Sequence, residues 1–325
     1  MRHAPLALIA AGALVGSTAL AQAADSWDMP TPYPDGNFHT QNVRAFAEDV
    51  KSMTGGELDI QVHSGASLFK MPEIKRAVRS GQAPIGEILL SAYGNESPIF
   101  EVDGIPFLAA GYDNAWKLYQ AQKPILEGLL AEEGLMLLFS VPWPGQALYT
   151  QEAISSVDDM KGVKFRAYNA ATSRLAELMG ALPTTVQYAE VPQAFATGLV
   201  SSMLTSGTTG VDTQSWDFVK YFYDTNAMHP KNATFVNKKS FDKLDPAVQE
   251  AVRKAAAAAE ERGWQMSRQA GSAAVQELRD NNMEVVTPDD KLMGQLETIG
   301  GTMTDEWLAK AGAQGKTLID NYNAQ

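Results

Sequence analysis

The sequence contains no cysteine and only four histidines among its 325 residues. Without cysteine, disulfides and thiol chemistry are excluded, so a packed core must stabilise the fold. His39, His63 and His229 have no partners at metal-ligand spacing, and the motifs H-E-x-x-H and G-x-S-x-G do not occur. These absences argue against common zinc and serine hydrolases, and we expect neither a metal nor a cofactor.

The sequence also has no apolar run of the ~20 residues that a membrane-spanning helix needs. Residues 6–15 form a shorter apolar run that follows a basic start and precedes Ala21-Gln22-Ala23. This layout is typical of a secretory signal peptide, with a buried N-terminal helix as the alternative. We expect residues 1–23 to be a signal peptide cleaved after Ala23, which makes the mature protein soluble and periplasmic.

Basic residues are scarce relative to acidic ones, with 26 Lys and Arg against 38 Asp and Glu and a net charge of −12. Loss of Arg2 with the signal peptide makes the mature chain more negative still. Such a surface repels nucleic acid, so no nucleic-acid partner is expected. An anionic ligand would need a local positive group to hold it against this overall charge.

What the sequence does contain is an alternation of strand-like and helix-like segments. Residues 43–53 have helical spacing and residues 58–62 alternate like a half-buried strand, and the second half repeats this order at 163–166 and 171–179. Two such blocks predict an α/β fold of two lobes with largely parallel sheets. Ligands in this class bind at the carboxyl ends of strands or in the crevice between lobes.

Adjacent carboxylates such as Asp158-Asp159 and Asp289-Asp290 are features that could suggest acid–base chemistry. Their polar, turn-like surroundings favour helix capping. A periplasmic lyase or hydrolase built from residues scattered along the sequence remains an alternative.

The strongest candidate for ligand binding is Arg166, which ends the 163–166 strand just before a helix. A guanidinium can hold a carboxylate through two parallel hydrogen bonds, and the N–H groups at a helix N-terminus also attract an anion. The alternative is a surface arginine in an ion pair.

A series of short motifs in a fixed order resembles the substrate-binding proteins of TRAP (tripartite ATP-independent periplasmic) transporters, over nearly all of residues 36–265. The most specific is D-x-x-G-x-K-x-R, matched by Asp159, Gly162, Lys164 and Arg166. The other matched segments are Thr54-Gly55-Gly56-Glu57-Leu58 and residues 68–81, 98–108, 179–183, 190–200 and 236–244.

The resemblance implies a type II-like periplasmic-binding-protein fold with a ligand cleft between two lobes and a long helix spanning both. We expect 24–146 plus 236–275 to form lobe I, and 147–235 plus 276–325 to form lobe II. The resemblance also implies that Arg166 is the carboxylate clamp. It further implies that small and large membrane permease subunits, driven by an ion gradient, receive the ligand. The receptor of an ATP-driven importer would share this fold and compartment.

Departures from the family pattern bear on the ligand. Thr205 and Ser206 follow the position where many relatives have an asparagine, so a hydroxyl is expected to replace the amide. Gln146 lies in the region where some relatives carry a second arginine, and this argues against dicarboxylates. Tyr188 occupies a position where relatives place an aromatic ring over the ligand. We therefore predict a small monocarboxylate with an apolar or aromatic body.

Further residues are expected to complete the site. Apolar walls are predicted from Trp143, Tyr93, Phe38 and Trp216, although a single aromatic side chain more often packs in a core. Polar features of the ligand would be read by Gln146, Glu87 and Asp212.

Overall fold

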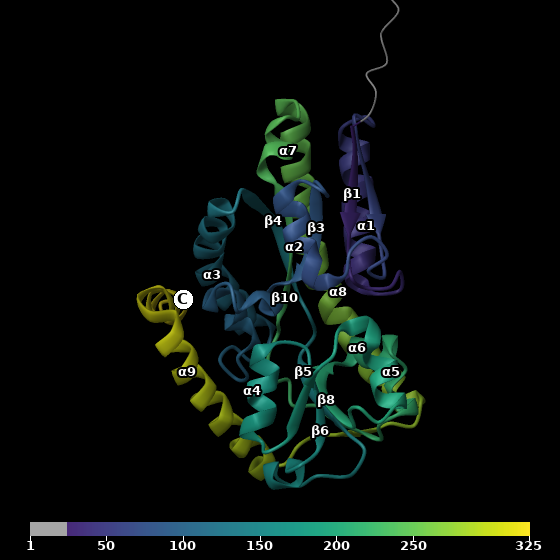
Figure 1. Cartoon of the computed structure of the whole chain (residues 1–325), viewed down its shortest axis with the longest axis vertical. Helices are drawn as coiled ribbons and strands as arrows, with labels where there is room; N and C mark the ends of the chain where they lie inside the picture. Colours follow the sequence, from purple (N-terminus) through teal and green to yellow (C-terminus); the bar gives the residue numbers. More distant parts are fainter. Residues whose placement is uncertain (1–24) are drawn as a thin grey trace, which may run out of the picture.

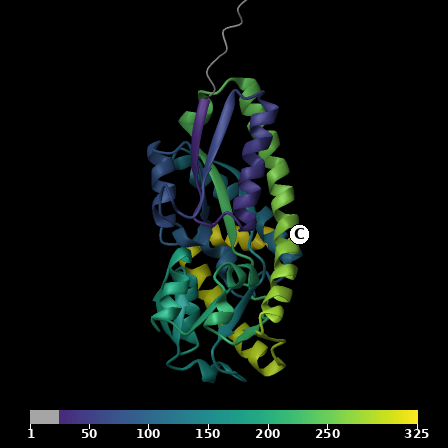
Figure 2. The same ribbon diagram turned by 90° about the vertical axis from the view of Figure 1, so that its right-hand side faces the viewer.

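The computed structural model describes residues 25–325, so the predicted signal peptide and its cleavage site lie outside the described residues. The described chain folds into two α/β lobes, one above the other in Figure 1. Helix α8 (Pro246–Asp280) runs along both lobes, as Figure 2 shows from the side. The predicted two-lobed fold with a spanning helix is confirmed.

The first lobe, at the top of Figure 1, contains two small sheets. Strands β3 (Ile85–Leu89), β10 (Lys231–Asn237) and β4 (Leu135–Pro142) form an antiparallel sheet with β10 in the centre. Strands β1 (Asp25–Pro30) and β2 (Leu58–His63) pair in parallel. The helices of this lobe are α1 (Phe38–Met53), α2 (Met71–Ser80), α3 (Tyr112–Glu132), α7 (Lys238–Asp242) and the 3₁₀ turns η1 (Leu90–Tyr93) and η2 (Pro98–Gly104).

The second lobe is built on one six-stranded sheet in the order β11-β9-β5-β8-β6-β7. Its strands are β5 (Gln146–Thr150), β6 (Lys164–Ala167), β7 (Leu182–Thr185), β8 (Ser202–Ser206), β9 (Tyr221–Tyr223) and β11 (Glu284–Val286). Its helices are α4 (Ala170–Leu178), α5 (Val191–Ala196), α6 (Gly207–Asp212) and the 3₁₀ turns η3 (Val157–Met160), η4 (Tyr188–Glu190) and η5 (Ser215–Asp217).

The prediction of largely parallel sheets is wrong, because the three-stranded sheet is antiparallel and the six-stranded sheet is mixed. In the six-stranded sheet β5 is antiparallel to both of its neighbours, whereas the pairs β11–β9, β8–β6 and β6–β7 are parallel. The reason is that β4 leads directly into β5 while β9 leads back into β10, so neighbouring strands run in opposite directions without a crossover helix. These pairings also place residues 231–235 in the sheet of the first lobe, whereas the sequence analysis assigned them to lobe II.

Two chain segments that are far apart in the sequence pass between the lobes side by side. The backbone N–H of Trp143 donates to Pro230 O at 2.8 Å, and that of Gln146 donates to Met228 O at 3.0 Å. Ala227 N–H donates in return to Gln146 O at 2.9 Å. We call residues 143–146 and 227–230 the linking segments; with α8 they connect the two lobes.

The long helices begin at the residues that the sequence indicated. Pro246 is the first residue of α8 and Asp245 occupies its N-cap position, although the Asp245 side chain makes no capping hydrogen bond. The carboxylate of Asp289 caps α9 (Asp290–Asn323) by accepting from Leu292 N at 2.8 Å. Asp159 likewise accepts from Ser156 N at 2.9 Å. The interpretation of the acidic pairs as capping residues is confirmed.

Helix α9 starts beside the second lobe and ends beside the first, on the left of Figure 1. Its Trp307 indole donates to Pro98 O of the first lobe at 2.7 Å. The second half of α9 therefore packs on the first lobe, although residues 276–325 were expected in lobe II. Among residues 25–325, none of the helices combines the length and the apolar character needed to cross a membrane.

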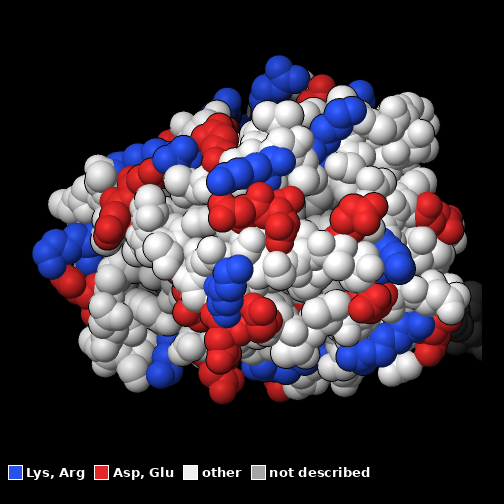
Figure 3. Space-filling model, turned by 90° about the horizontal axis from the view of Figure 1, so that it is seen from below, with Lys and Arg blue, Asp and Glu red and all other residues white. Residues whose placement is uncertain are grey.

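The lower end of the molecule, which belongs to the second lobe, carries charges of both signs. Figure 3 shows Lys and Arg side chains interspersed with Asp and Glu on this face. The net negative charge is thus not gathered there into a single acidic patch.

Candidate functional site

A cavity lies where residues of both lobes and of the linking segments meet. It holds about 440 Å³ of atom-free space, part of it open to solvent. Its lining is mostly aromatic, apolar and neutral polar: Pro32, Tyr33, Met71, Leu89, Trp143, Gln146, Arg166, Tyr168, Gln187, Tyr188, Thr205, Thr209 and Pro230. Such a lining suits a small ligand with few polar groups.

Arg166 is the one charged residue in this lining among the described residues. It lies on β6, where Phe165 points into the core of the second lobe, and its side chain is only 3% exposed. Its Nε donates to Val186 O at 3.0 Å, and its guanidinium lies 5.1 Å from the centre of the Tyr168 ring. The two terminal nitrogens are left for another partner.

Burial lowers the pKa of the Arg166 guanidinium to about 10, and no carboxylate of the described residues contributes to its environment. The group therefore remains charged at pH 7 although it is buried without a counter-ion. A buried charge without a partner is unfavourable. An anionic ligand would remove this penalty, and the arrangement can therefore bind a carboxylate.

Several other polar side chains in the cavity wall are held by neighbours. Tyr168 OH donates to Gln146 Oε1 at 3.3 Å, and Gln146 Nε2 donates to Pro144 O at 3.0 Å. Tyr188 OH donates to Asp212 Oδ2 behind the wall. These bonds fix the rings and the amide before a ligand enters, which reduces the entropy lost on binding.

The structure brings five of the ten predicted site residues into the lining. They are Arg166, Thr205, Tyr188, Trp143 and Gln146. They come from β6, β8, η4 and the first linking segment, which are far apart in the sequence but converge at the lobe junction. Their contacts with a ligand remain a prediction.

The other five predicted residues lie outside the lining. Tyr93 packs in a separate core cluster and its hydroxyl donates to Met71 O at 2.7 Å, while Phe38 packs behind Trp143 with 5.5 Å between ring centres. Ser206 caps α6 by accepting from Thr209 N at 3.2 Å. Asp212 and Glu87 bind other side chains behind the wall. Trp216, also considered as a wall, packs against the core of the second lobe.

Several lining residues were not predicted from the sequence, and four of them carry polar groups: Tyr33, Tyr168, Gln187 and Thr209. Tyr168 could have been found, because it follows Arg166 by two positions and alternate residues of an extended segment point to the same side. Tyr33 lies in a proline-rich loop after β1, where no periodicity predicts the direction of a side chain.

Comparison with known proteins identifies the family of this chain. The model of the bacterial extracellular solute-binding proteins, family 7 (DctP), matches residues 31–307. The chain belongs to this family. The resemblance to TRAP receptors is thereby confirmed, and a protein of this family acts outside the cytoplasm.

Three relatives of this family 7 receptor are informative. DctP6 of Bordetella pertussis, an extracytoplasmic solute receptor binding pyroglutamic acid, is 53% identical, with 92% of this chain and 100% of that chain covered and a TM-score of 0.91. DctP7 of the same bacterium, also described as binding pyroglutamic acid, is 47% identical with the same coverage and TM-score. The C4-dicarboxylate-binding periplasmic protein DctP of Rhodobacter capsulatus is 25% identical over 97% of this chain and 98% of its own.

The two lobes of the receptor contact each other on both sides of the cavity. Asn169 Nδ2, at the start of α4, donates to Ser91 Oγ of the first lobe at 2.9 Å. Asn37 Nδ2, at the start of α1, donates to Asp212 Oδ2 of the second lobe at 2.7 Å. These hydrogen bonds join the two lobes directly, in addition to the linking segments and α8.

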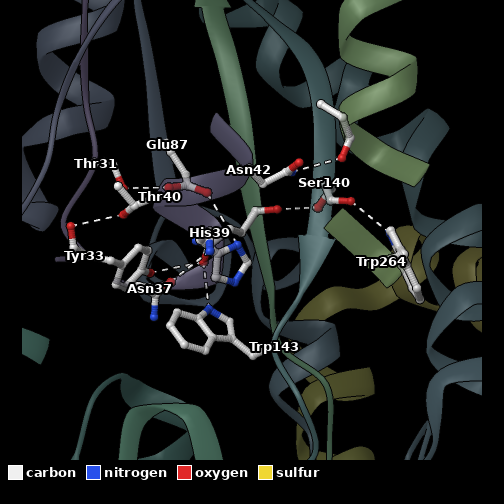
Figure 4. A network of polar contacts seen from close by, with 12 residues as sticks. Thr31, Tyr33, Asn37, His39, Thr40, Asn42, Glu87, Ser140, Trp143 and Trp264 are labelled. Atoms are coloured by element: carbon white, nitrogen blue, oxygen red, sulfur yellow. Dashed lines mark hydrogen bonds and ion pairs between the residues drawn. The ribbon is translucent and has the colours of Figure 1, made fainter. Parts of the chain in front are cut away.

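Behind the cavity, a buried carboxyl group and a buried imidazole face each other. Figure 4 shows Glu87 beside Thr31 and His39; Thr31 Oγ1 donates to Glu87 Oε2 at 2.6 Å, and His39 Nδ1 lies 3.5 Å from Glu87 Oε1. Burial raises the pKa of Glu87 to about 7 and lowers that of His39 well below its usual range. His39 is therefore neutral at pH 7, whereas Glu87 is protonated at mildly acidic pH and loses its proton as the pH rises through about 7.

The raised pKa of Glu87 leads us to expect that the free energy of unfolding depends on pH. Its pKa is about 7 in the folded protein and near the ordinary 4.5 when unfolded, so the folded state binds more protons between these values and its stability falls as pH rises through them. Glu87→Gln keeps an acceptor for Thr31 without this loss. We expect its free energy of unfolding to exceed that of wild type by up to ~3 kcal/mol at pH 8 and to lose this advantage at pH 5.

Urea denaturation at both pH values measures this difference, and exposed Glu57→Gln is the matched control. His39 contributes an opposite slope below its ordinary value of 6.5, which both proteins share. A Glu87→Gln variant that is less stable than wild type at pH 8 would contradict the assignment.

Proposed function

We propose that this protein is the receptor of a TRAP transporter for a small cyclic monocarboxylate of the pyroglutamate type. Small and large membrane permease subunits, driven by an ion gradient, would take up the ligand that it delivers. The observation that carries the proposal is Arg166, one buried guanidinium without a counter-ion in an otherwise neutral cavity.

The ligand's carboxylate is the group that Arg166 selects. Because Nε is bound to Val186 O, the two terminal nitrogens form the remaining fork, and their N–H groups match the two oxygens of a carboxylate. Two charge-assisted hydrogen bonds in a buried site bind more strongly than bonds to a neutral carbonyl.

The neutral remainder of the lining favours a ligand with no second charge. An amino acid would bring an ammonium group and a dicarboxylate a second anion, and neither would meet an opposite charge among the lining residues. Burying such a charge without a partner costs several kcal/mol. The ring amide of pyroglutamate is neutral, and Gln146, Gln187 and Thr205 offer donors and acceptors for its N–H and C=O.

The comparisons support this ligand class. The two Bordetella receptors described as binding pyroglutamic acid are 53% and 47% identical to this chain. The relative described as binding C4-dicarboxylates is only 25% identical. A monocarboxylate with an apolar body is also what the sequence predicts from the absence of a second arginine near Gln146.

A binding role fits the lining better than an enzymatic one. In the part of the chain that the structure describes, the cavity is lined by no histidine, aspartate, glutamate or lysine. General acid–base catalysis needs a group whose pKa lies near the working pH and which reaches the substrate. Neighbouring genes test the transporter class: two permease genes without an ATPase gene support a TRAP system, and an ATPase gene contradicts it.

Isothermal titration calorimetry with a panel of acids tests the ligand. We expect pyroglutamate to bind at least 100-fold more tightly than glutamate, proline or succinate, because each of these adds an uncompensated charge worth ~3 kcal/mol or more. A melting-temperature increase with pyroglutamate and no turnover should accompany binding. Equal affinity for succinate and pyroglutamate would refute the single-charge argument.

A further inference from the structure

Asn232 lies behind the cavity, at the centre of the first lobe's antiparallel sheet. It is 1% exposed and is absent from the cavity lining. On β10 it is paired with Leu89 of β3 on one side and Val141 of β4 on the other, and its backbone carbonyl also accepts from Ser140 Oγ at 2.6 Å. Its backbone is therefore fixed on both sides, which makes it a rigid base for its side chain.

The side-chain oxygen of Asn232 accepts two hydrogen bonds from the cavity wall. Trp143 Nε1 donates to Oδ1 at 2.9 Å and Tyr33 OH donates to the same atom at 3.1 Å. Because an indole N–H can only donate, the atom that faces Trp143 must be the oxygen, and the orientation of the amide is determined.

These two bonds set the angle between two rings that line the cavity. The rings of Tyr33 and Trp143 meet edge to face, with centres 5.0 Å apart and planes at 72°. Tyr188 of the second lobe completes the group, with its ring centre 5.1 Å from Tyr33 and 6.1 Å from Trp143. One oxygen atom thus connects the aromatic wall of the first lobe to that of the linking segment.

We propose that Asn232 is a positioning residue that fixes the relative orientation of the Tyr33 and Trp143 rings and thereby sets the affinity of the cavity for its ligand. The part that concerns affinity rests on the proposed function. Without the shared acceptor, both rings lose a directional bond, and two buried donors lose their partner. The rings then sample other rotamers and no longer present one preformed surface to the ligand.

The variant Asn232→Leu removes the acceptor at similar volume, and Ser140→Ala is the matched control, because it removes a buried hydrogen bond to the backbone of the same residue. The first readout needs no ligand: ¹⁹F NMR of protein labelled with 5-fluorotryptophan, with Trp143→Phe assigning the resonance. We expect the Trp143 resonance to shift or broaden in Asn232→Leu and to stay in place in Ser140→Ala.

The second readout is the Kd for pyroglutamate by calorimetry. We expect Asn232→Leu to weaken binding about 10-fold or more, and Ser140→Ala to leave it within about twofold. Tyr33→Phe should weaken binding in the wild-type background and have no further effect beside Asn232→Leu, since the bond that it removes is already lost.

Three results would overturn the proposal: an unmoved Trp143 resonance in folded Asn232→Leu, an unchanged Kd, or additive effects of Tyr33→Phe and Asn232→Leu. If Asn232→Leu fails to fold, Asn232→Ser takes its place, because its short hydroxyl cannot reach both donors. If wild type does not bind pyroglutamate, the proposed ligand is wrong, and the ligand-free resonance still decides whether Asn232 positions the rings.

Discussion

Arg166→Ala is expected to weaken pyroglutamate binding by about 10²- to 10⁴-fold, because a buried carboxylate would lose its charge-assisted bonds, worth ~3–5 kcal/mol. The ligand-free variant should melt at the same temperature as wild type or higher. This second expectation follows from the missing counter-ion: in the ligand-free protein, Arg166 is a buried charge whose only hydrogen bond in the described residues is to Val186 O. Calorimetry measures the affinity, and thermal unfolding with and without ligand measures stability.

Two further variants define the role of the guanidinium. Arg166→Lys keeps the charge but replaces the planar fork by a single ammonium group, so we expect it to recover only part of the lost affinity. Arg174→Ala removes an exposed arginine that pairs with Glu306 on the surface and should leave Kd unchanged. An Arg166→Ala variant that binds pyroglutamate like wild type would show that the carboxylate lies elsewhere.

Gly263→Ala is expected to destabilise the protein by ~1–3 kcal/mol even though alanine favours helices. Gly263 lies in α8 against the first lobe, and an added Cβ would lie 2.3 Å from Val141 Cγ2 and 2.7 Å from Asn42 Nδ2. Asn42 is itself committed, since its Nδ2 donates to Ala259 O at 3.0 Å and its Oδ1 accepts from Arg262 Nε at 2.9 Å. Helix α8 must therefore shift away from β4 and α1, and this shift loosens its packing against both elements.

Gly294→Ala in α9 is the control with the opposite expected sign. Gly294 is exposed, and its Cβ would have no heavy atom within 4 Å. Only the helix preference of alanine then acts, and the free energy of unfolding should rise by ~0.5–1 kcal/mol. Urea denaturation of both variants measures the contrast. If the two variants changed stability in the same direction, close packing at Gly263 would not be the cause.

The elements of this fold were predictable where the periodicity was regular. The apolar spacing of Val43, Phe46 and Val50 identified α1, and the pair Asp245-Pro246 identified the start of α8. The pairing directions were not predictable, because they depend on β4 running into β5 and β9 running back into β10. No local sequence pattern determines which strands become neighbours when a chain passes repeatedly between two lobes.

The same contrast between local sequence patterns and long-range contacts explains which features of the site could be predicted. Arg166 was identified from its motif and from its place at the end of a strand. Glu87 and Asp212 were expected to contact the ligand because they are polar residues near the predicted cleft, but their partners are Thr31 and, for Asp212, Asn37 and Tyr188. Whether a buried polar side chain faces a cavity or a neighbouring side chain depends on a small rotation about its backbone, which sequence spacing does not determine.

The hydrogen bonds between the linking segments bear on which cavity residues would move relative to one another if the lobes separated. Because these segments run side by side between the lobes, we expect any separation of the lobes to be a rotation about an axis near residues 143–146 and 227–230. In a rotation, an atom's displacement grows with its distance from the axis. We therefore expect Trp143, Gln146 and Pro230, which lie in these segments, to keep their mutual arrangement, and Arg166 and Met71, which belong to different lobes, to move apart. In an open receptor, the part of the cavity formed by Trp143, Gln146 and Pro230 would therefore already have its final arrangement. An acid bound to Arg166 would approach these residues as the lobes close.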